Sequence, residues 1–268
     1  MKIGIIGIGC VGYAILQDFT DKGIDVIIYD KYKDTYNKNL EDILITDIIF
    51  LCLPTPYDLN SKQYDKSSIY DTCNYLKLNN FKGLVVLKST VEPETTENIA
   101  INTGLLIVHN PEFLTASTSI LDFKNQNHIV LGYPKFLNKI ILNKLISFYN
   151  LYYPEADISI VTSTESELMK ISLNSFYAIK IQFFNEIYAI SNKLDINYDT
   201  VKNTMLKNNW INPMHTQVPG TDGQLSYGGM CFPKDTNALY QYMVRKNSIN
   251  KVLKSTIKER NKIRKNEL

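Results

Sequence analysis

One cysteine in the C-terminal part of the chain is placed where a thiol could react. Cys231 lies in the segment 228–235, which reads GGMCFPKD. A cysteine thiolate can attack an aldehyde carbon and then carry the acyl group as a thioester. The adjacent Lys234 and the helix predicted to follow favour the thiolate form. The segment alone leaves two interpretations open, a catalytic nucleophile and a buried structural cysteine.

A dinucleotide-binding fingerprint stands at the other end of the chain. The apolar run Lys2–Ile6 is followed by GIGCVG, with glycines at Gly7, Gly9 and Gly12, and then by a predicted helix. These glycines allow a tight turn, the approach of a pyrophosphate and close helix–strand packing. Asp30 ends the second predicted strand, where a carboxylate would bind a ribose hydroxyl and favour NAD over NADP. Glycine loops also occur in α/β proteins that bind no dinucleotide, but a nicotinamide site paired with a placed cysteine suggests oxidation of an aldehyde through a thioester.

Composition excludes several other classes. The 268 residues carry a net charge of only +2, which does not suggest a nucleic-acid partner. No apolar run approaches the ~20 residues that span a bilayer, and the chain enters its first strand at once, without a signal peptide. We therefore expect a cytoplasmic protein with no membrane partner. No metal site is expected, because the cysteines lie far apart, at Cys10, Cys52, Cys73 and Cys231.

Short apolar segments recur through the first part of the chain, alternating with helical or loop segments, and they predict strands at 2–6, 26–29, 48–53, 84–88, 105–108, 129–131 and 158–161. This rhythm predicts an α/β fold, a Rossmann-like, doubly wound parallel sheet over residues 1–162. Ligands of such sheets bind beyond the carboxyl ends of the strands. We therefore expect the loops that follow three of the strands, at 54–56, 89–91 and 109–112, to line a cofactor cleft.

The pattern becomes helical after residue 162, which predicts an all-helical central domain over residues 163–268. Thr164 and Glu167 have capping-box spacing before a long helix that ends near Lys193. Lys170 and Asn174 share one face of this helix, where they could stabilise negative charge on a substrate oxygen or simply face solvent. The loop 208–230 then leads to Cys231, and a loop of this length inside a compact domain more often has a function than none.

Seven motifs taken in order resemble the UDP-glucose/GDP-mannose dehydrogenase family from end to end. They are Gly7–Gly12, Asp30, PTP at 54–56, STV at 89–91, NPEFL at 110–114, the helix from Glu167 to Glu186, and Gly228–Asp235. The resemblance implies a twofold, NAD-dependent oxidation of the C6 hydroxyl of a nucleotide-sugar, UDP-glucose to UDP-glucuronate. GDP-mannose or a UDP-N-acetyl-sugar as substrate, and a catalytically inactive binding protein, are the alternatives.

The same resemblance implies catalytic roles. Cys231 matches the nucleophile that forms a thiohemiacetal and then a thioester. Lys170 and Asn174 match the pair that stabilises the oxyanion and alkoxide. Asp235 and Thr90 match the residues that position the catalytic water.

Further roles follow from the resemblance alone. Glu112 matches the general base for thioester hydrolysis, and it lies with Thr55 and Thr90 at positions near the nicotinamide. The nucleotide-sugar is expected to contact Phe113, Leu114, Tyr227 and Gly228. A homodimer through the central helices is also expected.

The chain departs from the family pattern in three places. It ends inside the long helix after which relatives continue into a further domain. Three alternatives stay open: the chain is a minimal enzyme, it is a fragment, or the further domain is supplied separately. No arginine stands in the segment 209–213, where relatives carry one. His128 stands where many bacterial relatives have arginine, and no role follows for it, nor for Trp210 or His215.

Overall fold

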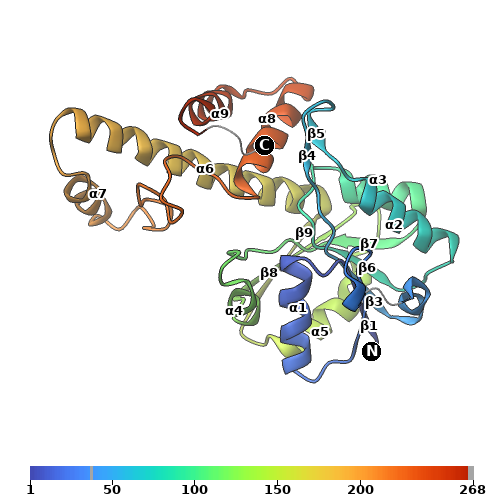
Figure 1. Ribbon diagram of the computed structural model, residues 1–268. Helices are drawn as coiled ribbons and strands as arrows, with labels where there is room; N and C mark the ends of the chain where they lie inside the picture. The colour runs from blue at the N-terminus through green and yellow to red at the C-terminus, as the bar shows by residue number, and fades with distance from the viewer. Residues whose placement is uncertain (37–38, 265–268) are drawn as a thin grey trace. The chain divides into compact units, whose positions relative to one another are not determined.

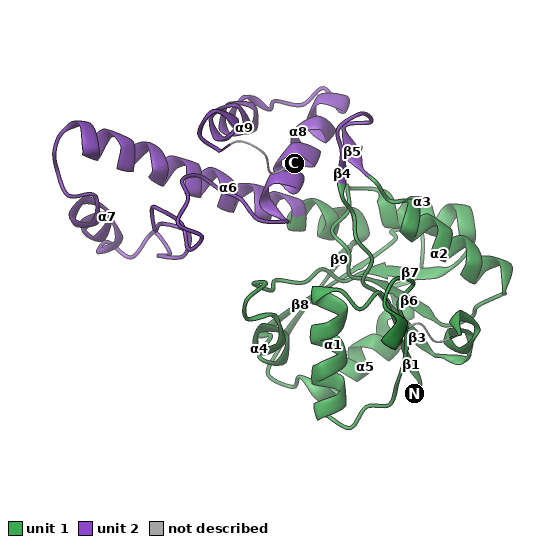
Figure 2. Ribbon diagram, viewed as in Figure 1, with its two compact units in different colours: residues 1–56, 65–170 green, residues 57–64, 171–268 purple. Residues whose placement is uncertain are grey.

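The computed structural model describes residues 1–36 and 39–264. The chain forms two compact units, coloured separately in Figure 2. Unit 1 contains residues 1–56 and 65–170, and unit 2 contains residues 57–64 and 171–268. The sequence predicts a division at residue 162, where the pattern changes from strands to helices. The two units are instead defined by which residues pack together. The first turns of the long helix therefore belong to unit 1, and an eight-residue hairpin from the N-terminal half belongs to unit 2.

A seven-stranded sheet forms the centre of unit 1, in the order β2-β1-β3-β6-β7-β8-β9 (Figure 1). The first five strands are parallel: β2 (Val26–Tyr29), β1 (Ile3–Ile6), β3 (Ile48–Leu51), β6 (Leu84–Leu87) and β7 (Leu106–His109). The predicted parallel arrangement needs one correction, because β8 (His128–Tyr133) runs antiparallel to β7. The last strand, β9 (Asp157–Thr162), is parallel to β8.

Side chains of the buried strands alternate between two hydrophobic clusters, one on each face of the sheet. In β3, Ile48 and Phe50 enter the first cluster, while Ile49 and Leu51 enter the second, as the two-residue period of a strand requires. Both faces are covered, which explains why these strands are apolar throughout. The first cluster is covered by α1 (Cys10–Asp21), α4 (Ser119–Lys124) and α5 (Asn143–Tyr152), and the second by α2 (Ser67–Leu78) and α3 (Thr95–Thr103). Short 3-10 helices span Asp34–Tyr36, Leu40–Ile45 and Lys139–Leu142.

Unit 2 combines helices with one small hairpin. Its elements are the hairpin β4 (Tyr57–Asp58) and β5 (Gln63–Tyr64), the later turns of α6 (Ser163–Lys193), and the helices α7 (Tyr198–Leu206), α8 (Phe232–Arg245) and α9 (Lys251–Ile263). The segment between α7 and α8 is anchored by side chains of the helices. For example, the amide oxygen of Asn185 accepts from the backbone N–H of Ser226 at 2.8 Å. The hydroxyl of Tyr198 donates to the carbonyl of Thr216 at 2.6 Å.

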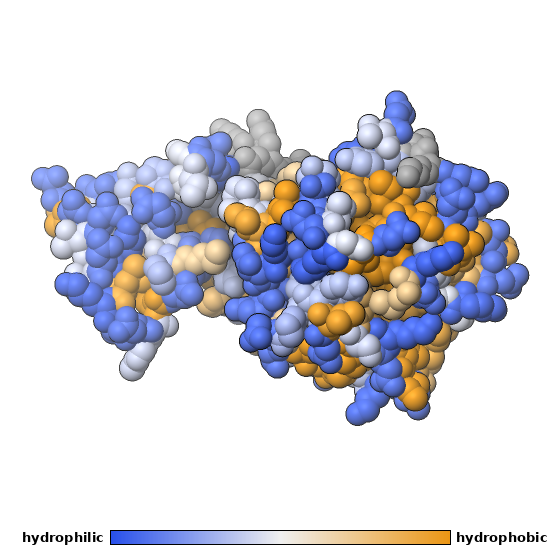
Figure 3. Space-filling view, turned by 90° about the horizontal axis from the view of Figure 1, so that it is seen from below, coloured by the Kyte–Doolittle hydropathy of each residue, from blue (hydrophilic) through white to orange (hydrophobic). Residues whose placement is uncertain are grey.

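Apolar and polar residues are interspersed on the face drawn in Figure 3. Within residues 1–36 and 39–264, none of the helices combines the length and the apolar character needed to cross a bilayer.

Candidate functional site

The glycine loop of unit 1 has the geometry that the fingerprint predicts. Gly7 has φ +90°, and a Cβ atom there would lie 2.5 Å from the carbonyl oxygen of Cys52. A Cβ at Gly12 would lie 1.9 Å from the carbonyl oxygen of Gly7. Apart from Gly9 and its two chain neighbours, no described residue has an atom within 4 Å of the Cβ position at Gly9, and no described side chain caps α1 at that residue. Uncapped N–H groups beside open space fit the pyrophosphate of a dinucleotide.

Asp30 joins the end of β2 to this loop. Its Oδ2 accepts from the backbone N–H of Ile8 at 2.7 Å, and its Oδ1 accepts from the backbone N–H of Tyr32 at 2.9 Å. The ammonium of Lys33 donates to the carbonyl of Ile8 at 2.6 Å. A carboxylate oxygen accepts two hydrogen bonds. Asp30 can therefore hold the loop and still accept from a ribose hydroxyl.

Two of the predicted cleft loops are bonded to each other. The hydroxyl of Thr55 donates to the carbonyl of Thr90 at 2.8 Å. The hydroxyl of Ser89 donates to the carbonyl of Leu53 at 2.6 Å. Because β3 and β6 are neighbouring parallel strands, these loops leave the sheet at the same edge, as expected for a cofactor site.

A third loop, after β7, brings five predicted or unassigned residues together. The carboxylate of Glu112 lies 3.4 Å from the ammonium of Lys170. That ammonium also lies 5.3 Å from the centre of the Phe113 ring. The Phe113 ring in turn stacks on His128, with 5.8 Å between centroids. The second oxygen of Glu112 accepts from the backbone N–H of Leu114 at 2.6 Å. His128 thus has a packing partner that the sequence did not give, because the antiparallel course of β8 brings it there.

Lys88 contacts the same loop, and it was not identified from the sequence as part of the site. It is buried, and its ammonium donates to the side-chain oxygen of Asn110 at 3.0 Å and lies 3.4 Å from the carbonyl oxygen of Pro111. The hydroxyl of Tyr149 donates to the same Asn110 oxygen at 2.5 Å. Burial lowers the pKa of Lys88 to about 8. A lysine directly after the apolar strand Leu84–Leu87 was the available signal.

The start of α6 corrects the predicted capping box. Glu165, not Glu167, reaches back, and its carboxylate accepts from the backbone N–H of Thr162 at 2.8 Å. Both T-x-x-E pairs have the required spacing, so the sequence could not separate them. Glu167 is instead buried against α3, where its Oε1 accepts from the N–H and hydroxyl of Thr96 at 2.7 and 2.5 Å. Burial raises the pKa of Glu167 to about 7.

In unit 2 three side chains gather around Asp235, which is fully buried. Its Oδ2 accepts from the amide of Asn174 at 2.6 Å. Its Oδ1 accepts from the ammonium of Lys234 and from the hydroxyl of Tyr64, both at 2.5 Å. The pairing of Asn174 with Asp235 joins two predicted site residues. Tyr64 was missed, because nothing in its local sequence links it to a helix 171 residues away.

Cys231 directly precedes α8 and is exposed, which argues against the buried structural cysteine. Its carbonyl accepts from the backbone N–H of Asp235 at 3.0 Å, the first turn of the helix. Gly228 is partly exposed, whereas the Tyr227 side chain is buried and its carbonyl accepts from Arg260 at 3.3 Å. This region can therefore present a thiol and glycine backbone, but not the Tyr227 ring, to a ligand.

The two remaining unassigned residues lie in the loop before α8. Trp210 is almost fully exposed. The ring of His215 packs against Tyr177 and Phe232, with centroids 4.8 and 5.4 Å apart. Burial lowers the pKa of His215. Because Phe232 follows Cys231 directly, His215 supports the start of the cysteine-bearing helix.

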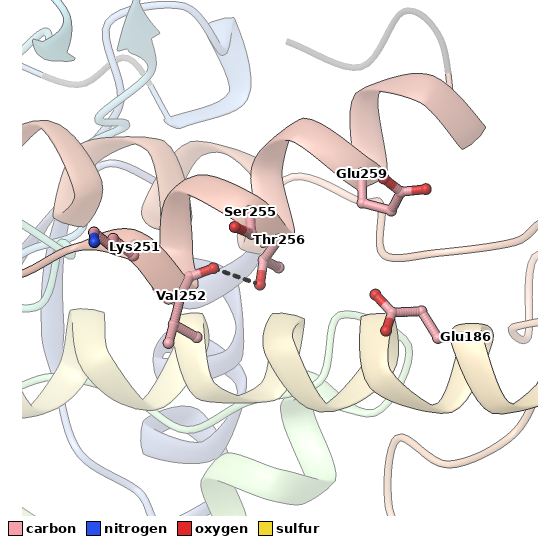
Figure 4. Close-up of a pocket in the computed structure, with 6 residues that line it drawn as sticks. All are labelled: Glu186, Lys251, Val252, Ser255, Thr256 and Glu259. Carbon is pink, nitrogen blue, oxygen red and sulfur yellow. Dashed lines mark hydrogen bonds between the residues drawn. The ribbon is translucent and has the colours of Figure 1, made fainter.

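A groove of about 440 Å³ lies between α6 and α9 within unit 2, and none of the predicted site residues lines it (Figure 4). Glu186 and Glu259 project into it from the two helices, and Lys251 lies at one end. Two carboxylates against one ammonium make a poor site for a nucleoside diphosphate.

Comparisons with known proteins point to one family. The NAD binding domain of the UDP-glucose/GDP-mannose dehydrogenase family matches residues 34–150, and the central domain of that family matches residues 164–262. The chain is 27% identical to a UDP-glucose 6-dehydrogenase of Campylobacter jejuni over 99% of its own length, and 30% identical to one of Rhizobium meliloti over 89%. It spans 73% and 62% of these two relatives and about half of several others.

A solved structure supports the fold. A UDP-glucose dehydrogenase from Pyrobaculum islandicum superposes with a TM-score of 0.82 at 22% identity, covering 97% of this chain and 68% of that one. The two family domains occur here in the family order and together match more than half of the chain. This chain therefore belongs to the UDP-glucose/GDP-mannose dehydrogenase family, whose members are NAD-dependent nucleotide-sugar dehydrogenases.

Proposed function

We propose that this chain catalyses the NAD-dependent twofold oxidation of UDP-glucose to UDP-glucuronate. The observation that carries the proposal lies within unit 2. An exposed thiol, Cys231, stands one helical turn before Asp235, a buried carboxylate that is hydrogen-bonded to Asn174. A protein that only binds a nucleotide-sugar needs no such combination of nucleophile and oriented carboxylate.

In the first oxidation the C6 hydroxyl loses its proton while a hydride leaves the carbon. Bound NAD supplies the hydride acceptor for both oxidations. Lys170 and Asn174, one turn apart on α6, would stabilise the negative charge that develops on the C6 oxygen. Donors of this kind contribute about 3 kcal/mol each at comparable oxyanion sites.

In the second oxidation the thiolate of Cys231 attacks the aldehyde carbon and forms a thiohemiacetal. Loss of a second hydride and of the hydroxyl proton gives the thioester. Water then attacks the thioester carbon, the carbon–sulfur bond breaks, and the carboxylate leaves with the thiol restored. The resemblance to the family supports Glu112 as the general base of this step, and Asp235 and Thr90 as residues that position the water. In balance, one alcohol, one water and two NAD give one carboxylate, two NADH and three protons.

The choice of UDP-glucose rests on the relatives, of which two at 27% and 30% identity are named UDP-glucose 6-dehydrogenase. The test is to incubate the purified chain with NAD and, in turn, UDP-glucose, GDP-mannose, UDP-N-acetylglucosamine and UDP-N-acetylmannosamine, and to measure NADH. We expect two NADH per UDP-glucose. The same stoichiometry with another sugar would correct the substrate, and no NADH with any sugar, despite NAD binding, would refute the activity.

Substitution of the nucleophile tests the mechanism. Cys231→Ser is expected to reduce turnover to the carboxylate by at least ~10³-fold, because the serine hydroxyl is not ionised at neutral pH and the second oxidation needs the thiolate. NAD affinity, measured by calorimetry, should stay near the wild-type value. The matched control is Cys73→Ala, which removes a buried thiol from α2 and should retain turnover. Equal turnover of Cys231→Ser and wild type would contradict the thioester route.

We also infer a homodimer through the central helices. Helix α6 exposes Phe176, Phe183 and Ile190 at seven-residue spacing, and large apolar side chains in such a row are typical of helix–helix contacts. Light scattering should give twice the chain mass, and Phe183→Glu should give a monomer. A wild-type monomer at micromolar concentration would contradict the inference.

A further inference from the structure

The hairpin β4–β5 places a tyrosine against the carboxylate that the proposed mechanism assigns to the catalytic water. We infer that Tyr64 is a positioning residue, which fixes Asp235 and decides which of its oxygens can hold that water. The inference rests on the proposed function, and every group that carries it lies in unit 2.

Hydrogen bonds close the turn of the hairpin and anchor its tip to α8. The side chain of Asp58 accepts from the backbone N–H groups of Asn60 and Ser61 at 3.0 and 3.1 Å, which closes the turn. Arg245 at the end of α8 donates to the carbonyl of Lys62 at 3.1 Å. The hairpin is therefore held against α8 at its tip, so its last residue, Tyr64, has a defined position.

The ring of Tyr64 is held as firmly as its backbone. It is buried in a cluster with Ile171 of α6, Leu239 of α8 and Leu253 of α9. The ammonium of Lys234 lies 4.7 Å from the ring centre, within cation–π range. A ring enclosed by three helices leaves the phenol hydroxyl little freedom, so its hydrogen bond to Asp235 is preorganised.

The hydrogen bonds of Asp235 are divided unequally between its two oxygens. Oδ1 accepts from Tyr64 and from Lys234, and these two hydrogen bonds occupy both lone-pair acceptor positions of that oxygen. Oδ2 accepts from Asn174, which among the described residues leaves one acceptor position on this oxygen. Tyr64 and Lys234 thereby direct any further donor, such as a water molecule, to Oδ2, the oxygen already bonded to a proposed catalytic residue.

A tyrosine suits this role because it provides a neutral donor beside a charged one. A second ammonium at Oδ1 would repel Lys234, whereas a phenol adds a hydrogen bond to the carboxylate without adding charge. Removing the hydroxyl would open an acceptor position on Oδ1 and let a water bind on the wrong side. The expected defect is therefore slow thioester hydrolysis, with both hydride transfers little affected.

The test uses Tyr64→Phe, which keeps the ring and its packing. Wild type and variant are mixed with NAD and the preferred sugar nucleotide, quenched at intervals, and measured by intact mass for the acyl adduct on Cys231. We expect the adduct to form at the wild-type rate and to decay roughly tenfold or more slowly. The matched control is Tyr240→Phe, which removes a hydroxyl from another tyrosine packed on the same cluster, and its adduct should decay as in wild type.

A double variant distinguishes an effect that acts through Asp235 from a general loss of packing around Tyr64. If Tyr64 acts through Asp235, Tyr64→Phe should slow hydrolysis much less in an Asp235→Asn background than in wild type. Adduct decay at the wild-type rate in Tyr64→Phe, or additive effects in the double variant, would overturn the inference. These outcomes differ from failure of the proposed function, in which wild type itself forms neither NADH nor adduct, and the inference falls with it.

Discussion

The two units each contribute a carboxylate to the proposed chemistry, and they hold it in opposite ways. Asp235 in unit 2 is fully buried and accepts from three side chains on three elements. Glu112 in unit 1 keeps 14% of its side chain exposed, and its side-chain partner, Lys170, lies at 3.4 Å. One carboxylate is fixed by its surroundings, and the other is accessible and loosely paired.

The difference matches what each group is proposed to do. A residue that orients water must keep its geometry throughout the reaction, and preorganised hydrogen bonds provide that. A general base must gain a proton and release it to solvent, which requires access and weak pairing. The contrast assigns different sensitivities to the two carboxylates, which Asp235→Ala and Glu112→Gln test. Glu167→Gln adds a buried carboxylate of unit 1 for comparison. The three substitutions follow in decreasing order of their effect on the free energy of unfolding.

Asp235→Ala should have the largest effect. It leaves the amide of Asn174, the hydroxyl of Tyr64 and the ammonium of Lys234 without their shared acceptor, in a buried place. Removing one partner of a buried charged network costs about 3–5 kcal/mol, which thermal or urea unfolding can measure. Asp235→Asn, which keeps the shape and one acceptor oxygen, should cost less. Equal stability of Asp235→Ala and wild type would show that the network is not formed.

Glu167→Gln should have an intermediate effect that depends on pH. Oε1 of Glu167 is bonded to Thr96, while its Oε2 has no partner among the described residues. The pKa is raised from 4.5 to about 7 by burial, so the folded state binds the proton more tightly than the unfolded state. The contribution of Glu167 to the free energy of unfolding is therefore fully present below pH ~4.5 and is lost as the pH rises to about 7.

Glutamine cannot ionise, and its carbonyl can still accept from Thr96. We expect Glu167→Gln to equal wild type near pH 4.5 and to be more stable by about 2–3 kcal/mol at pH 8. Urea unfolding at the two pH values measures the difference. A variant that is less stable than wild type at pH 8 would mean that the charged form of Glu167 is favoured at the N-terminus of α3.

Glu112→Gln should have the smallest effect on stability and a large one on turnover. The pair with Lys170 is long, at 3.4 Å, and the amide oxygen of glutamine can still accept from the Lys170 ammonium, so the substitution should change the unfolding free energy by only about 1 kcal/mol. Loss of the general base should slow thioester hydrolysis by about 10²–10⁴-fold. Intact mass should then show the acyl adduct accumulating. A large fall in stability with normal turnover would reverse the roles assigned to Glu112 and Asp235.

Local patterns predicted much of this molecule. The strands at β1, β2, β3 and β6, the turn of the glycine loop and the long helix ending at Lys193 were confirmed, because each depends on periodicity or on backbone sterics within a few residues. The capping box was placed two residues late, because two T-x-x-E pairs overlap at the start of α6. The direction of β8 was not foreseen, because an apolar run reads alike in either direction.

The amino-acid sequence alone indicates the available chemistry: a glycine loop ending one strand, a carboxylate ending the next, and a cysteine before a helix. These follow from residue type and short spacing. The folded chain is needed to show which carboxylate is fixed and which is accessible, and that Tyr64 reaches Asp235 across 171 residues. Burial and hydrogen-bond partners depend on long-range packing, in which an eight-residue hairpin joins helices from the other end of the chain. No local pattern specifies that packing.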